Sequence, residues 1–231
     1  MEISGLQKLT LLDFPGRTAC TVFTGGCNLR CPFCHNASLV VHAPPDPIDQ
    51  EQFWAFLKKR QGLLDGVCVT GGEPLLHGDL PAFLEQIRSL GYAVKLDTNG
   101  TFPDRLKQVL DAGLVDYVAM DLKNSPEKYP ETCGISDPAL LEKVGESVRL
   151  LKAQTRIDVE FRTTLVAQYH TLEDIRAIGR WLAGAPHYFL QRFVDSGDLI
   201  ASGLSEVPPA EATRFLQEIQ SSVPAAALRG Y

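Results

Sequence analysis

Residues 66–100, GVCVTGGEPLLHGDLPAFLEQIRSLGYAVKLDTNG, have the sequence pattern of a strand, a helix and a second strand. The apolar run Gly66–Thr70 predicts a buried strand, and Leu80–Leu90 repeats Leu, Phe and Ile at the spacings of an amphipathic helix. Gly91 stands where that helix should end, and Ala93–Asp97 predicts the next strand. A strand, a helix and a second strand in succession indicate a parallel sheet covered by helices.

The same alternation continues from Thr18 onward. Strands rich in Val, Phe, Leu or Thr are expected at Ala19–Phe23, Gly66–Thr70, Ala93–Asp97, Tyr117–Leu122, Asp158–Leu165 and Tyr188–Phe193. Helices are expected at Gln50–Gln61, Leu80–Leu90, Asp104–Ala112, Pro138–Lys152, Leu172–Leu182 and Ala210–Ser221. Thr171 and Asp174 favour a helix cap, and Gly113 marks a helix end. Six βα units are fewer than a closed barrel needs, so we expect an α/β fold, a partial (β/α)6 TIM-like barrel with parallel strands, open on one side.

Length, composition and charge limit the number of domains and the kinds of partner that we expect. With 231 residues, 45% apolar and 22% charged, we expect one domain over residues 1–231, with a core at about 18–195 and a C-terminal helix and tail at 196–231. A net charge of −6 argues against a broad phosphate-binding face, so a nucleic-acid partner is not expected. Met1–Leu12 lacks the features of a secretory signal and no apolar run reaches membrane-spanning length, which favours the cytoplasm and no membrane partner.

A loop with three cysteines follows the first predicted strand. This cysteine loop, residues 25–36, reads GGCNLRCPFCHN and contains Cys27, Cys31 and Cys34. Three thiolates ligate three irons of a four-iron cluster and leave one iron open to an exogenous ligand. The spacing therefore indicates a [4Fe–4S] cluster that takes part in chemistry.

Zinc is the alternative metal for such a loop. A zinc site would normally require a fourth Cys or His at short range, and His35 is awkwardly placed directly beside Cys34. Cys20, Cys68 and Cys133 stand alone and are interpreted as buried small apolar residues.

Glycine and acidic residues follow the next predicted strands. Gly71 and Gly72 would let the backbone come close to a ligand. Asp97 and Asp121 end neighbouring strands, and two close carboxylates repel unless they are protonated or bridged by a cation. Either aspartate could instead cap the turn that follows it. Arg162 in the fifth strand could hold a carboxylate, although an arginine in a strand is usually solvated or paired.

The cysteine loop resembles the CxxxCxΦC signature of the radical S-adenosylmethionine (SAM) superfamily, with Phe33 as the aromatic residue. The resemblance implies that Cys27, Cys31 and Cys34 hold the cluster and that SAM is the second cofactor. An electron from the cluster would cleave SAM to methionine and a 5′-deoxyadenosyl radical, which abstracts hydrogen from a substrate. Phe33 would border the adenine, and the backbone of Phe33, Cys34 and His35 would contact it.

Other residues match family positions that contact the methionine part of SAM. Gly71, Gly72 and Glu73 resemble the GGE motif, which binds the methionine amino group. Arg162 corresponds to an arginine that meets the methionine carboxylate.

A narrower resemblance is to the glycyl-radical-enzyme activases, which share the Cys34-His35-Asn36, Asp97-Thr98-Asn99-Gly100 and Asp121-Leu122-Lys123 segments. It implies that Asp97, Thr98 and Asp121, with the Ala119 carbonyl, surround a monovalent cation (Na⁺ or K⁺), and that Lys123 lies near SAM. Asp13-Phe14-Pro15-Gly16-Arg17 favours the activating proteins of anaerobic ribonucleoside-triphosphate reductase. The partners would be a glycyl radical enzyme as protein substrate and reduced flavodoxin or ferredoxin as electron donor.

Two alternatives stay open. One is a radical SAM enzyme that acts on a small molecule or nucleobase, similar to 7-carboxy-7-deazaguanine synthase, and the other is an iron–sulfur electron carrier. Gln191 and Arg192 receive no role. The final residues Arg229-Gly230-Tyr231 are interpreted as a frayed tail, with the further hypothesis that they mimic the glycyl segment of a partner in the substrate groove.

Overall fold

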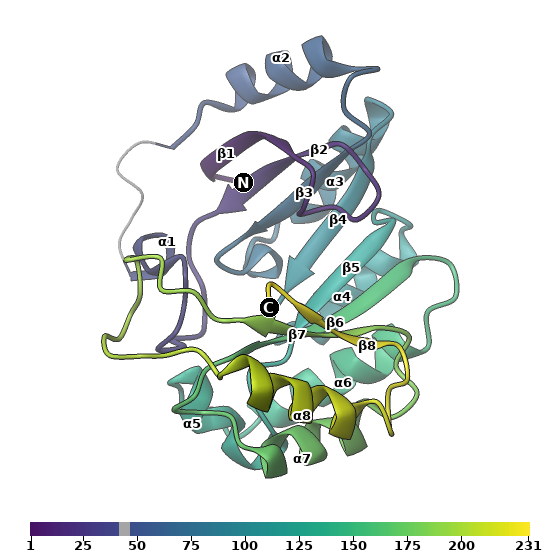
Figure 1. The fold of residues 1–231 in the computed structure, drawn as a ribbon. Coiled ribbons are helices and arrows are strands. Elements are labelled where there is room, and N and C mark those ends of the chain that lie inside the picture. The colour runs from purple at the N-terminus through teal and green to yellow at the C-terminus, as the bar shows by residue number, and fades with distance from the viewer. Residues whose placement is uncertain (42–46) are drawn as a thin grey trace.

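The computed structural model describes residues 1–41 and 47–231, and Figure 1 shows their arrangement. The described residues form one sheet of eight strands in chain order: β1 (Ile3–Thr10), β2 (Ala19–Thr24), β3 (Gly66–Gly71), β4 (Ala93–Thr98), β5 (Tyr117–Asp121), β6 (Asp158–Leu165), β7 (Tyr188–Arg192) and β8 (Ala226–Arg229). The β1–β2 pair is antiparallel and the pairs from β2 to β8 are parallel. The sheet begins at β1 and ends at β8 without closing, which confirms the predicted open partial barrel.

Helices connect successive parallel strands. They are α1 (Ala37–Val41), α2 (Gln50–Arg60), α3 (Leu80–Ser89), α4 (Pro103–Asp111), α5 (Tyr129–Cys133), α6 (Leu140–Lys152), α7 (Leu172–Leu182) and α8 (Pro209–Ile219), with short 3-10 turns at Pro74–Leu76 and Pro126–Lys128. Figure 1 shows α2 at one end of the molecule and α5 to α8 gathered at the other. Within the described ranges, no helix is both long and apolar enough to span a bilayer.

The predicted start and stop signals occur where the sequence places them. The Thr171 hydroxyl accepts from the Asp174 amide, and the Asp174 carboxylate accepts from the Thr171 amide at 2.9 Å, which makes a capping box at the start of α7. Gly91 and Gly113 follow α3 and α4 in the left-handed conformation that glycine tolerates. The six predicted strands and six predicted helices all form.

The two edge strands are a correction to the sequence analysis. β1 was missed because its burial does not alternate: its centre is half-buried or exposed, and its register against β2 shifts twice. β8 shows that the frayed-tail interpretation is wrong for Arg229, which pairs with β7. The Arg229 guanidinium donates to both oxygens of Glu160 at 3.0 and 2.9 Å and stacks 3.7 Å from the centre of the Phe189 ring.

The two faces of the sheet differ in polarity. Along β4, Val94 and Leu96 belong to the apolar core under the helices, whereas Lys95 and Asp97 meet on the opposite, concave face. At the start of the strands Phe14 packs edge-on against Tyr117, with ring centres 6.0 Å apart. Polar side chains therefore fill the concave face between this aromatic plug and the carboxyl ends of the strands.

The ends of β2 and β3 approach each other very closely. The Gly26 carbonyl accepts from the Glu73 amide at 2.9 Å, and the Thr24 carbonyl accepts from the Gly72 amide at 2.9 Å. A Cβ atom on Gly72 would lie 1.8 Å from the Gly26 oxygen. Glycine is therefore required at position 72 by the protein's own backbone. The expectation from the sequence that the two glycines let the backbone approach a ligand stays a prediction.

We expect Gly72→Ala to lower the free energy of unfolding by about 3 kcal/mol, because the backbone of one strand end must move. Gly78→Ala is the matched control, since nothing lies within 4 Å of its added methyl group. Urea unfolding under reducing conditions measures both variants. Equal stability of the two variants would contradict the close approach.

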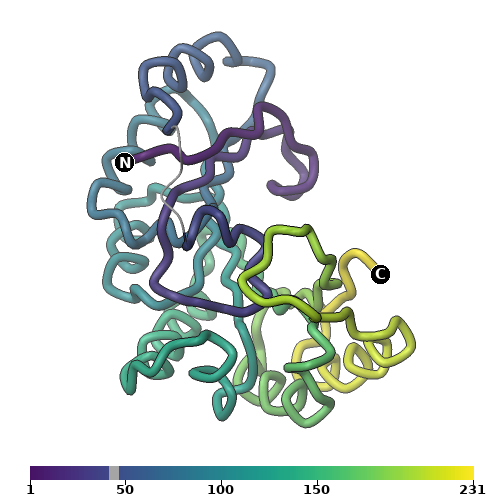
Figure 2. The backbone as a smooth tube through the Cα atoms, turned by 90° about the vertical axis from the view of Figure 1, so that its left-hand side faces the viewer, coloured from purple at the N-terminus to yellow at the C-terminus, as the bar shows by residue number. Residues whose placement is uncertain are grey.

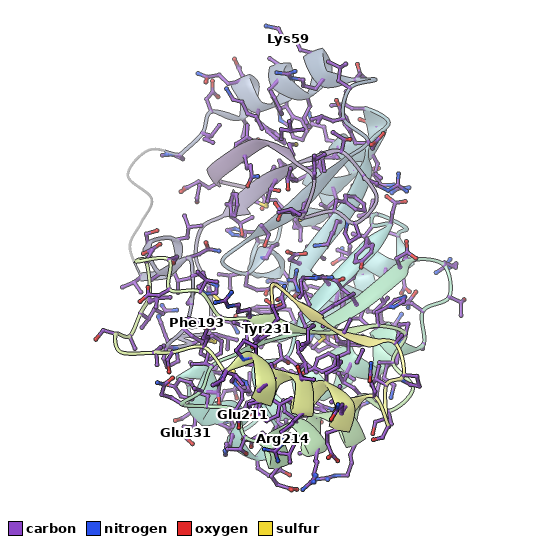
Figure 3. The ribbon with its side chains drawn as sticks, viewed as in Figure 1. Lys59, Glu131, Phe193, Glu211, Arg214 and Tyr231 are labelled. Carbon is purple, nitrogen blue, oxygen red and sulfur yellow. The ribbon has the colours of Figure 1, made fainter. Side chains whose placement is uncertain are left out.

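We expect Arg229→Gln to lower the free energy of unfolding by about 2 kcal/mol, because Glu160, only 1% exposed, loses a charged two-point partner. Arg214→Gln is the control: Arg214 is exposed on α8, and Figure 3 labels it there. The control should stay within about 0.5 kcal/mol of the wild type. If both substitutions cost the same, β8 is not anchored through Glu160.

Candidate functional site

The cysteine loop leaves β2 and is held near its start and in its middle by backbone hydrogen bonds. Gly26 donates to the Leu39 carbonyl of α1 at 2.8 Å and accepts from Glu73. Arg30 donates to the Cys133 carbonyl at the end of α5 at 2.8 Å. The positions of the thiols are therefore set by the main chain of three different elements.

A segment far along the chain packs beside this loop. Residues 194–208, which follow β7, run alongside the cysteine loop and α1 in both views (Figures 1 and 2). The Ala201 amide donates to the Pro32 carbonyl at 2.9 Å, and the Ser38 hydroxyl donates to the Asp198 carboxylate at 2.7 Å. These contacts join the loop after β2 to the loop after β7.

Cys27 has two N–H donors directed at its sulfur. The Leu29 amide lies 3.4 Å from Sγ and the Asn99 side-chain amide lies 3.7 Å from it. The Asn99 amide is oriented by its other contacts, since its nitrogen also donates to Asn28 and its oxygen accepts from the Thr101 amide and hydroxyl. Such donors stabilise negative charge on a sulfur.

The pKa values of the three thiols in the cysteine loop are shifted in different directions. Burial raises the pKa of Cys27 to about 11 and also raises the pKa of Cys34. The pKa of Cys31 is lowered, first by the neighbouring Cys133 thiol, although burial opposes this. Metal binding by these thiols requires loss of their protons and is coupled to pH.

Glu73 joins the ends of β3 and β4 instead of facing solvent. Its buried carboxylate accepts from the Thr98 hydroxyl at 2.8 Å, the Asn99 amide at 2.7 Å and the Leu75 amide at 3.0 Å. Burial raises the pKa of Glu73 to about 7, and the three donors oppose that rise. The side chain thus fixes the backbone around the two glycines before it.

Asp97 and Asp121 end neighbouring strands and share a cationic partner. Arg162 Nε donates to Asp121 at 2.8 Å, and its terminal nitrogen lies 3.3 Å from Asp97. Lys95 pairs with Asp97, and Lys123 lies 3.1 Å from Asp121. Burial disfavours the ionised Asp121, but Arg162 and Lys123 outweigh it and lower the pKa.

Two aromatic side chains of the cysteine loop pack against rings that follow β6 and β7. Phe33 is buried against Tyr169 and His170, with ring centres at 5.7 and 6.3 Å. His35 stacks on Phe193 at 5.4 Å, and burial lowers the pKa of His35. Both rings therefore have fixed positions at the rim of the site.

One pocket collects most of the residues that the sequence predicted. Its cavity measures about 160 Å³, and its mouth is open to solvent. The predicted residues that line it are Cys27, Cys31, Phe33, Cys34, His35, Gly71, Gly72, Asp97, Thr98, Asp121 and Lys123. Glu73 and Arg162 lie behind this lining and contact it through Thr98, Asn99, Asp97 and Asp121.

The remaining predicted residues lie outside the pocket. Ala119 is buried in β5 directly beside Asp97 in the strand ladder. Gln191 and Arg192 line a separate, shallower depression next to His35, and Arg192 pairs with Glu206. The three lone cysteines Cys20, Cys68 and Cys133 are buried as predicted.

Three polar residues of the site have no individual role in the sequence analysis. Asn36 donates to the Gly71 carbonyl at 3.2 Å and so ties the cysteine loop to β3. The Asn99 side-chain amide is directed at the Cys27 sulfur. Lys95 forms an ion pair with Asp97 from its position two residues earlier in β4. A signal for Lys95 was available, because a lysine two positions before an aspartate in a strand shares its face.

The donor chemistry suits a multi-iron cluster. Three soft thiol ligands line one pocket, and the Cys27 sulfur has N–H donors directed at it, of the kind that tune the reduction potential of iron–sulfur clusters. Among residues 1–41 and 47–231, no group of three or more Cys, His, Asp or Glu side chains converges on a single ion.

The sequence matches a family model and named relatives. The model of the radical SAM superfamily matches residues 21–182. A Methanocaldococcus jannaschii protein provisionally named a glycyl-radical enzyme activating enzyme is 32% identical over 83% of this chain and 79% of its own length. A 7-carboxy-7-deazaguanine synthase of Methanopyrus kandleri is 29% identical over 52% of this chain and 57% of its own length.

Solved structures with low sequence identity share the fold. A radical SAM methyltransferase from Sphaerobacter thermophilus superposes on 96% of this chain and 68% of its own chain, with a TM-score of 0.75 and 16% identity. Streptococcus suis SuiB bound to its precursor peptide SuiA has a TM-score of 0.72 and 12% identity over 91% of this chain, which spans 48% of the SuiB chain. With the match to the family model over most of its length, the chain belongs to the radical SAM superfamily.

Proposed function

We propose that this protein is a glycyl-radical-enzyme activase: it uses SAM to abstract hydrogen from a glycine of a partner enzyme, which we take to be anaerobic ribonucleotide reductase. The observation that carries the proposal is that three activase-like segments end at one pocket. They are Cys34-His35-Asn36, Asp97-Thr98-Asn99-Gly100 and Asp121-Leu122-Lys123, and each contributes to the lining. The name of the M. jannaschii relative supports the same class.

In this proposal the pocket holds two cofactors that the family implies. Cys27, Cys31 and Cys34 would hold a [4Fe–4S] cluster and leave its fourth iron open. Phe33 and His35 would border the adenine of SAM, while Gly71 and Gly72 would present backbone groups to the methionine end. When bound, the reduced cluster supplies the electron that cleaves SAM and so provides the hydrogen-abstracting species.

The chain's own residues orient and shield the reacting groups. Glu73 fixes the Gly71–Gly72 backbone through its contact with Asn99, and the Asn99 amide is directed at the Cys27 sulfur. Lys123 lines the pocket and can meet a carboxylate of the bound cofactor. Arg162 already binds Asp97 and Asp121, so a cofactor carboxylate that met Arg162 would have to lie next to these two aspartates.

A monovalent cation between Asp97 and Asp121 is not carried into the proposal, because all four carboxylate oxygens already face a nitrogen of Lys95, Arg162 or Lys123. The rest of the expectation stands as proposed: residues 1–231 act as one radical SAM domain in the cytoplasm, and reduced flavodoxin or ferredoxin supplies the electron.

A second candidate is a reaction on a small molecule, as in 7-carboxy-7-deazaguanine synthase. The similarity to the Methanopyrus kandleri enzyme of that name favours it, over a smaller part of the chain than the activase relative covers. The third alternative, an iron–sulfur electron carrier, predicts a cluster that does not cleave SAM.

Anaerobic incubation of the reduced protein with SAM and anaerobic ribonucleotide reductase tests the proposal. We expect the doublet of a glycyl radical in the electron paramagnetic resonance spectrum, because the pocket presents cleaved SAM to a protein substrate. A reductase whose radical-bearing glycine is replaced by alanine is the control and should give no doublet. SAM cleavage without a radical on any glycyl radical enzyme supplied would favour the small-molecule reaction.

A further inference from the structure

The two aspartates at the ends of β4 and β5 are surrounded by cationic side chains of the protein itself. One oxygen of Asp97 pairs with Lys95, and the other lies 3.3 Å from Arg162. One oxygen of Asp121 accepts from Arg162 at 2.8 Å, and the other lies 3.1 Å from Lys123. Each of the four carboxylate oxygens therefore faces a different protein nitrogen or a different atom of the shared guanidinium.

Lys95 differs from the other two cations in its position. Its side chain is 1% exposed and does not line the pocket, whereas Lys123 does. Its ammonium group lies 3.8 Å from the Cys68 sulfur and 5.7 Å from the centre of the Tyr117 ring. It is thus enclosed by a thiol, an aromatic face and Asp97, and among residues 1–41 and 47–231 Asp97 is the one carboxylate with which it pairs.

A buried ammonium group is stable only when it is paired, because its removal from water is costly. Asp97 in turn depends on Lys95, because its carboxylate would lack a counter-ion of its own if Lys95 were neutral. Arg162 is shared with Asp121 and Glu160, so it cannot serve Asp97 alone.

The local charge balance leaves no room for a further cation. The connected ion pairs join Lys95, Lys123, Arg162 and Arg229 to the carboxylates of Asp97, Asp121 and Glu160. These pairs connect four cations to three carboxylates, so the connected group already carries one more positive than negative charge. An added metal ion would increase this excess of positive charge in a largely buried region.

We infer that the Lys95 ammonium group is a built-in monovalent cation, which takes the place of an inorganic ion in holding Asp97 at the edge of the pocket. Lys95 is a positioning residue, since it touches Asp97 and not the pocket. The inference does not depend on which substrate or partner the protein has.

The test compares melting temperatures of the anaerobically reconstituted full chain in NaCl, KCl and choline chloride at equal ionic strength. The wild type should melt at the same temperature in all three salts. Lys95→Met keeps an unbranched side chain, one atom shorter than lysine, and removes the charged nitrogen. In choline chloride we expect this variant to melt about 5 °C lower than the wild type, with saturable recovery in Na⁺ or K⁺ because a small ion can enter the vacated place.

Two further variants make the result decisive. Lys107→Met removes an exposed lysine that pairs with Asp111 on α4, and it should respond to salt as the wild type does. Lys95→Arg keeps the charge and should not acquire a dependence on Na⁺ or K⁺. If Lys95→Met does not fold, the test rests on the wild type and Lys95→Arg. Melting temperatures of these two proteins that are equal in NaCl, KCl and choline chloride support the inference.

Specific stabilisation of the wild type by Na⁺ or K⁺ over choline would overturn the inference, as would a folded Lys95→Met that gains nothing from either ion. These readouts follow the folded protein and not SAM cleavage, so their failure is distinct from failure of the proposed activity.

Discussion

The hydrogen bond from the Glu73 amide to the Gly26 carbonyl holds the cysteine loop against the end of β3, and the site depends on it. This contact is possible only because the residue before Glu73 has no side chain. The Glu73 carboxylate extends the connection to β4 by accepting from Thr98 and Asn99. Three successive strand ends are therefore joined by backbone hydrogen bonds and by the Glu73 carboxylate, which fixes the cysteine loop relative to the ends of β3 and β4.

The concave face of an open barrel imposes a second constraint. Side chains that point inward from neighbouring strands cannot all reach water, so charged groups placed there must neutralise one another. Arg229 of the last strand, Glu160 and Arg162 of β6, and the aspartates of β4 and β5 do this in sequence. The same ion pairs that stabilise the open edge of the sheet also fix the acidic wall of the pocket. Stability of the sheet and geometry of the site are thus coupled.

Much of this arrangement could be predicted from the sequence. Val, Leu and Phe periodicity located the six central strands, and the cysteine spacing located the pocket, because both signals are local. The edge strands escaped prediction: β1 is largely half-buried or exposed, and β8 is held by Arg229 reaching Glu160, a contact between residues far apart in the chain. The partners of Lys95 and Asn99 were hidden for the same reason, since register between strands decides which side chains meet.

We propose that three cysteines leave one cluster iron open to SAM inside the pocket lined by Gly71, Gly72 and Lys123. Electron paramagnetic resonance of the reduced, reconstituted protein before and after addition of SAM tests it most directly. The account predicts that SAM changes the spectrum of the reduced cluster, because the ligand joins the iron that lacks a thiolate. An unchanged spectrum at saturating SAM would contradict it.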